Sequence, residues 1–161
     1  MRHRRPTSVL QSFTAAIVLG VLCPQAYAVI LGQCTASASG VAFGIYDPLS
    51  PTALASTATV SVSCSLVATA SDITIDLRTG ASGSYASRSL LNGPSSLSYN
   101  LYQDSAHTQI WGNGTGGSTE FAGKVTPGKP SVSATVYGLL PASQDVAPGS
   151  YTDTITVTVN Y

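Results

Sequence analysis

Few residues of this sequence have side chains that commonly act in catalysis. The chain has two histidines, and His3 lies in an N-terminal leader described below. His107 lies within residues 104–108, Asp-Ser-Ala-His-Thr, a composition typical of a turn beside a strand. No Gly-x-Ser-x-Gly nucleophile motif occurs. The sequence therefore predicts no catalytic residues, and we expect His107 to lie in a surface turn.

A glycine-rich stretch resembles a phosphate-binding loop only in its spacing. Residues 112–117, Gly-Asn-Gly-Thr-Gly-Gly, match the pattern Gly-x-Gly-x-x-Gly. Dinucleotide sites need a helix directly after that loop, and no helical periodicity follows residue 117. We therefore interpret the stretch as a hairpin loop and predict no cofactor. Asn113 also begins an Asn-Gly-Thr glycosylation sequon, which matters only in a eukaryotic secretory pathway.

Acidic residues and the histidine do not form a clear metal-binding pattern. Asp72 and Asp76 share the polar face of an expected strand, with Arg78 beside them. Carboxylates can bind calcium, but charges on a strand also discourage pairing with other chains, and we favour that interpretation. Zinc sites need several histidine or cysteine ligands. We therefore predict no metal site.

Aromatic residues near the glycine-rich stretch leave a ligand-binding alternative open. Most tyrosines are expected at the core and its rim, because their rings are apolar and their hydroxyl groups polar. Tyr102, Trp111 and Asn113 lie close together in the sequence. An aromatic platform with neighbouring polar groups is typical of sugar-binding surfaces, so these three residues define a possible lectin site.

The N-terminus has the three parts of a secretory signal peptide. Arg2, Arg4 and Arg5 form a basic start, residues 13–23 are largely apolar, and Ala26-Tyr27-Ala28 is a typical cleavage motif. The apolar run is short for a membrane span. A lipoprotein with Cys23 as the modified residue is the alternative. We predict cleavage after Ala28, one mature domain over 29–161, and no stable membrane insertion.

Charge and cysteine content describe the mature chain further. Three basic residues leave with the leader, whereas all seven acidic residues remain, so no basic patch is expected to bind nucleic acid. Cys34 and Cys64 are the two remaining cysteines. An even number in an oxidising compartment predicts a disulfide, with two separate buried thiols as the alternative.

Alternation of apolar and polar residues with a period of two dominates the mature chain. Between the alternating runs lie turn signals such as Asn92-Gly93-Pro94 and Pro148-Gly149. Short strands with frequent turns predict an all-β sandwich of immunoglobulin-like topology. The alternating runs cover residues 57–66, 72–78, 97–102, 132–137 and 151–161.

Several ordered segments resemble the spore coat protein U domain family. The resemblance covers nearly all of residues 34–161. It rests on Cys34, Val-Ala-Phe-Gly-Ile-Tyr-Asp-Pro at 41–48, Val-Ser-Val-Ser-Cys at 60–64, Leu-Ser-Tyr-Asn-Leu-Tyr at 97–102, Trp-Gly-Asn-Gly at 111–114, Val-Tyr-Gly-Leu-Leu-Pro at 136–141, and Gly-Ser-Tyr-Thr-Asp-Thr at 149–154.

The resemblance implies a secreted spore coat protein or a subunit of an archaic chaperone–usher pilus. Such pilins are sandwiches that lack their final strand, which a periplasmic chaperone and then the next subunit supply. It also implies that Cys34 and Cys64 are bonded to each other. The partners it implies are the chaperone, an outer-membrane usher and other pilus or coat subunits, with the protein in the periplasm during transit and then on the cell surface.

The last alternating run is the expected wall of an assembly groove. The sequence ends at Tyr161 while this run continues, so we expect its far edge to be uncovered. A complete sandwich whose last strand ends there is the alternative. The residues on its apolar face are Tyr151, Ile155, Val157, Val159 and Tyr161.

The predicted mature N-terminus departs from a pilus shaft subunit. A donor strand needs about ten residues, but only residues 29–33 precede Cys34 after the predicted cleavage. We therefore predict a non-enzymatic, secreted structural subunit of a pilus or coat, in a terminal or accessory position. A secreted carbohydrate- or surface-binding adhesin is the first alternative, and a small secreted hydrolase is the second.

Overall fold

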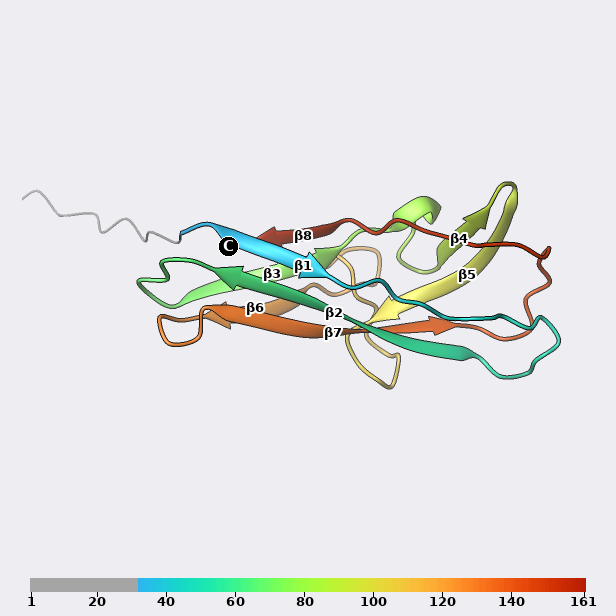
Figure 1. Ribbon diagram of the computed structural model, residues 1–161, viewed down its shortest axis with the longest axis horizontal. Coiled ribbons are helices and arrows are strands. Elements are labelled where there is room, and N and C mark those ends of the chain that lie inside the picture. Colours follow the sequence, from blue (N-terminus) through green and yellow to red (C-terminus); the bar gives the residue numbers. More distant parts are fainter. Residues whose placement is uncertain (1–31) are drawn as a thin grey trace, which may run out of the picture.

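The computed structural model describes residues 32–161, in which nearly all regular structure is β-strand (Figure 1). A single 3-10 turn lies at Gly80–Ser82, and no helix in this part of the chain is long and apolar enough to cross a membrane. The leader predicted at 1–28 lies outside the described residues. The strands are β1 (Cys34–Ala38), β2 (Leu54–Cys64), β3 (Ser71–Leu77), β4 (Arg88–Asn92), β5 (Ser95–Tyr102), β6 (Phe121–Val125), β7 (Ser131–Leu140) and β8 (Val157–Asn160).

The strands form two antiparallel sheets that enclose one core. The first has the order β1-β2-β7-β5-β4, and the second has the order β6-β3-β8. In β2, buried Val60 and Val62 alternate with Ser61 and Ser63 on the outer face, and β7 pairs with β2 along most of its length. Inward residues of β3 and β5 complete the core from the two sheets. The predicted immunoglobulin-like sandwich is confirmed.

The disulfide joins two strands of the larger sheet. Cys34 at the start of β1 lies directly opposite Cys64 at the end of β2, and their Sγ atoms are bonded. The bond closes a loop with a sequence separation of 30 residues. It therefore attaches β1, an edge strand with β2 as its neighbour, to the centre of the sandwich.

The strands differ from the sequence prediction at the edges of the sheets. Strands β1, β4 and β6 have five residues each and were not among the alternating runs. The run predicted at 151–161 pairs as a strand only in β8. Before β8, Thr152 forms an isolated bridge with Leu91 of β4. The chain therefore pairs with β4 at residue 152 and with β3 from residue 157, and the residues between these two points have no continuous strand partner.

Candidate assembly groove

Two segments with little strand pairing lie on either side of an opening in the sandwich. Residues 38–48 run on from the last residue of β1, and residues 146–157 end at the first residue of β8. Between them lies a cavity of about 590 Å³, continued toward β8 by one of about 210 Å³. Val41, Phe43 and Leu90 line both cavities, so the two are adjacent. We call the two cavities together the groove.

The floor and walls of the groove are mostly apolar. Tyr151 lines the larger cavity, and Ile155 and Val157 line the smaller one. Val159 is half-buried against the core, whereas Tyr161 is 56% exposed. Of the five residues predicted to face an assembly groove, the structure therefore places three in the groove lining. The floor is formed by Ala58, Val60, Leu77, Leu97, Leu101, Val136 and Leu140.

Both strands next to the groove have an edge without a strand partner in residues 32–161. Strand β8 pairs with β3, and β1 pairs with β2. An edge strand presents backbone N–H and C=O groups to any further strand that approaches it. The groove thus combines apolar side chains inside with available backbone groups at its border.

Specific contacts hold the wall at residues 38–48 in place. Val41 and Phe43 pack over Gly138 of β7, where an added Cβ would lie 2.7 Å from Val41 Cγ1. Tyr46 accepts a hydrogen bond at its hydroxyl oxygen from the backbone N–H of Gln144, at 2.6 Å. The Gln144 side chain accepts from the N–H of Ser98 and donates to its C=O, as a neighbouring strand would. These contacts keep the wall attached to β5 and β7.

A carboxylate holds the opposite wall. Asp153 Oδ2 accepts a hydrogen bond from the Tyr99 hydroxyl at 2.7 Å, and Oδ1 accepts one from the N–H of Ala81 at 2.9 Å. Gly80 has a positive φ of 66° and no side chain, which leaves room for this carboxylate. Burial raises the pKa of Tyr99 above its ordinary value, and Asp153 adds to the shift, so the hydroxyl stays a donor.

Asp153 was not among the residues predicted to face the groove. It shares the inward face with Tyr151 and Ile155, because it lies two residues from each along an alternating run. The prediction counted only apolar residues, so it left this aspartate out. The period-two alternation nevertheless assigns position 153 to the inward face.

Beneath the groove lies a buried polar group that includes a charged side chain. Arg88 of β4 has no exposed surface and donates to Asn100 Oδ1 at 2.6 Å and to the C=O of Trp111 at 2.7 Å. Burial lowers the pKa of Arg88 from its ordinary value. Asn100 donates to the C=O of Tyr85. We call Arg88, Asn100 and Trp111 the buried centre.

A comparison with known families agrees with this architecture. The sequence profile of the Spore Coat Protein U domain family matches residues 21–158. The chain belongs to this family. A curated relative, Protein U of Myxococcus xanthus, is 36% identical over 132 residues, which cover 74% of this chain and 70% of the relative.

A solved structure shares the fold of this spore coat U domain. It is the crystal structure of the CsuC–CsuE chaperone–tip adhesion subunit pre-assembly complex from archaic chaperone-usher Csu pili of Acinetobacter baumannii. The match has a TM-score of 0.56 and 20% identity over 80% of this chain. The chain spans 40% of the length of the matched chain.

The aromatic platform on which the lectin alternative depended does not form in this spore coat U domain. Trp111 has no exposed surface, and its Nε1–H donates to the C=O of Ile75 at 2.8 Å. Tyr102 instead packs edge-on against His107 at 5.2 Å between ring centroids. Asn113 accepts hydrogen bonds from Thr115 within its own loop. The three residues therefore do not form one surface.

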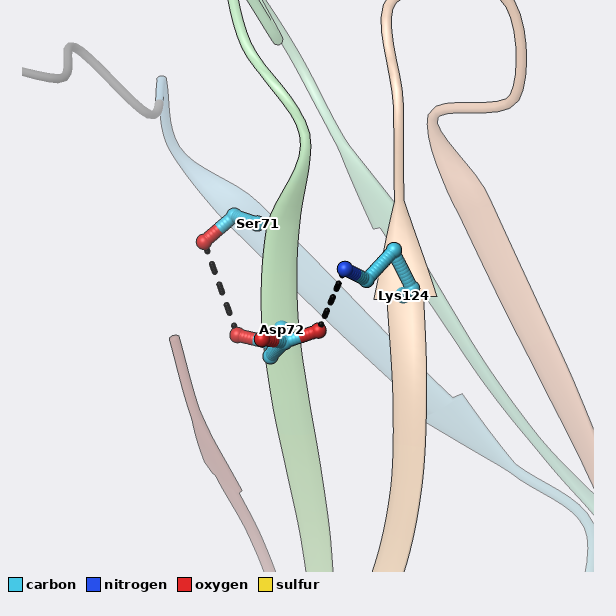
Figure 2. A network of polar contacts seen from close by, with 3 residues as sticks. All are labelled: Ser71, Asp72 and Lys124. Carbon is cyan, nitrogen blue, oxygen red and sulfur yellow. Dashed lines mark hydrogen bonds and ion pairs between the residues drawn. The ribbon is translucent and has the colours of Figure 1, made fainter.

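The remaining predicted polar residues lie apart from the groove lining. Asp72 Oδ1 forms an exposed ion pair with Lys124 on β6 at 3.1 Å, and Ser71 lies beside it (Figure 2). Asp76 Oδ2 accepts from Asn160 Nδ2 at 3.3 Å. His107 lies in a turn with a positive φ, as expected. No group of three or more potential metal ligands occurs within 32–161.

Proposed function

We propose that this spore coat U domain is a non-enzymatic structural subunit of a surface pilus or coat, assembled by donor-strand complementation. The groove supports this proposal most directly, because it is long, apolar and bordered by unpaired strand edges. A strand from another chain would pair along the edge that runs from residue 146 into β8 and place alternate side chains in the groove. This mode of recognition takes its affinity from backbone hydrogen bonds and its register from side-chain pockets.

The length of the groove is suited to a strand rather than to a small ligand. One wall extends over residues 146–157. Residues 146–151 line the larger cavity, and Asp153, Ile155 and Val157 line the smaller one. An extended segment of about ten residues would span a wall of this kind. Its inward side chains would cover Leu90, Ile155 and Val157, which are only partly buried in the free chain.

The proposed partners are a periplasmic chaperone, an outer-membrane usher and other subunits. The solved structure with the same fold contains a chaperone bound to a pilus subunit, which supports the first of these. The predicted cleavage after Ala28 leaves only residues 29–33 before Cys34. We therefore assign the domain a terminal or accessory position, in which it receives a strand and does not donate one.

Co-expression tests this function with two matched variants. Ile155→Asn places an amide in the groove, whereas Thr156→Asn places it on the exposed face of the same segment. The full chain is produced in a periplasm with and without the archaic-type chaperone from its own genome. We expect the chaperone to raise the soluble yield of wild type and Thr156→Asn several-fold and to co-purify with both, but not with Ile155→Asn.

Two results of this experiment would contradict the proposed function. A wild-type chain that is a stable, soluble monomer alone, with no gain from the chaperone and no complex with it, would exclude donor-strand complementation. Equal co-purification of both variants would show that the chaperone binds elsewhere.

A further inference from the structure

The groove contains one charged group among its apolar lining, and that group lies near its middle. Asp153 lines the smaller cavity, and Tyr151, two residues before it, lines the larger one. The two cavities meet at Val41, Phe43 and Leu90. A strand that fills the whole groove would therefore have apolar surface at both ends and a carboxylate between them.

The hydrogen bonds of Asp153 leave one oxygen incompletely used. Oδ1 accepts from the N–H groups of Ala81 and Thr154, at 2.9 and 2.8 Å, whereas Oδ2 accepts from the Tyr99 hydroxyl alone. An ionised carboxylate has about four acceptor positions. Water can occupy the remaining position of Oδ2 while the groove is open.

Filling the groove removes that water, and within residues 32–161 no lysine or arginine forms an ion pair with Asp153 to replace it. Arg88 donates to Asn100 and to backbone carbonyl groups rather than to Asp153. Lys124 instead pairs with Asp72 on the exposed face of the β6-β3-β8 sheet. A carboxylate buried with an unused acceptor position is unfavourable unless a donor reaches it.

We infer that Asp153 sets the register and the sequence of the donor strand by requiring a hydrogen-bond donor at the one inward position that faces it. This inference rests on the proposed function of the groove. The donor segment would have apolar residues at its other inward positions and a threonine, serine or lysine at this one. A strand that slides by two residues would place an apolar side chain against Asp153 and lose the hydrogen bond.

A peptide series tests the inference with the unmodified full chain. The parent peptide has ten residues, with valine at five inward positions and serine at the outward ones. Five further peptides each replace one inward valine with threonine, which has nearly the same shape and adds a hydroxyl. Binding is measured by titration calorimetry, and a peptide of equal length with prolines at outward positions is the control that cannot pair as a strand.

The sign of the threonine effect is the decisive observation. At one inward position, we expect threonine to tighten binding about tenfold, because its hydroxyl donates a hydrogen bond to the acceptor position of Asp153 that valine leaves unused. At the other positions, we expect weaker binding because a hydroxyl enters an apolar pocket. In Asp153→Asn, which keeps the shape without the charge, the gain should fall below about threefold.

Two negative results separate this inference from the proposed function. Peptides that bind well but weaken with threonine at every inward position would overturn the role of Asp153 and leave the groove proposal standing. A chain that binds none of the peptides would remove the groove proposal, and this inference would fall with it.

Discussion

Strands β3 and β8 are neighbours in the same sheet, but their inward side chains are buried to different extents. Ile75 lies opposite Val159, and Leu77 lies opposite Val157. Ile75 and Leu77 are 0% and 2% exposed, whereas both valines are only half-buried. Strand β3 has β6 and β8 on its two sides, and β8 has β3 alone within the described chain. The difference in burial follows from the number of neighbouring strands.

This contrast divides the domain into a part that is fully buried and a part that the proposed donor strand would cover. The buried centre has its polar atoms bonded within the chain, and Trp111 is enclosed completely. The groove has apolar residues that are only partly buried in the free chain, and the proposed donor strand would cover them. Substitutions in the two parts should therefore act on different measurements.

The largest loss of stability is expected in the buried centre. Trp111→Ala removes a fully enclosed indole and the hydrogen bond from Nε1 to Ile75. We expect the free energy of unfolding to fall by about 3–5 kcal/mol, as for other large-to-small core substitutions. Urea denaturation of the full chain measures this. A loss below about 1 kcal/mol would show that the indole is not enclosed in solution.

The disulfide should have the next largest effect, because it attaches β1 to the rest of the sandwich. Replacing Cys34 and Cys64 together by alanine opens a loop with a separation of 30 residues. The chain-entropy account predicts a loss of about 3–4 kcal/mol. Thermal unfolding with and without reductant provides an independent measurement, and equal melting temperatures in the two conditions would contradict the prediction.

The same substitution in the two parts sharpens the comparison directly. Ile75→Ala removes methyl groups from a fully buried site, for which about 2–5 kcal/mol is typical. Ile155→Ala removes them from the half-buried groove wall, so we expect a loss of only about 1 kcal/mol in the free chain. Urea denaturation of both variants measures the difference. Equal losses would mean that the groove is already closed.

The smallest effect is expected at the exposed ion pair. Lys124→Ala removes a contact with Asp72 in which both side chains are more than half exposed. Surface pairs of this kind contribute about 0–1 kcal/mol, and salt screens them further. Unfolding of this variant at low and high ionic strength should differ from wild type by less than about 1 kcal/mol. A larger loss would assign the pair a structural role.

Sequence patterns located the long central strands because their two faces differ in polarity. The alternation in β2 and β7 directly reflects one buried and one exposed face. The last strand was predicted to be longer than it is. Alternation over 151–161 places Tyr151, Ile155 and Val157 on the inward side but fails at the exposed Tyr161, and it does not reveal whether a neighbouring backbone is present to pair with.

The positions of Trp111 and Asp153 depended on contacts that are distant in the sequence. Trp111 precedes a glycine-rich loop, which suggested exposure, whereas its indole bonds to Ile75, 36 residues away. Asp153 bonds to Tyr99, 54 residues away. No local pattern specifies such partners. The family resemblance, by contrast, rested on many short motifs in order and was confirmed by the family match.

Hydrogen exchange on the full chain, free and with a bound donor strand, tests the central claim most directly. Amides that open locally exchange faster than those of a stable core. In the free chain, we expect fast exchange across residues 146–156, which precede β8, and slow exchange in β2 and β7. A bound strand should slow exchange at 146–156 and 38–48 by at least about tenfold and leave β2 and β7 unchanged. Protection of 146–156 equal to that of β7 in the free chain, with no change on addition of the strand, would contradict an open assembly groove.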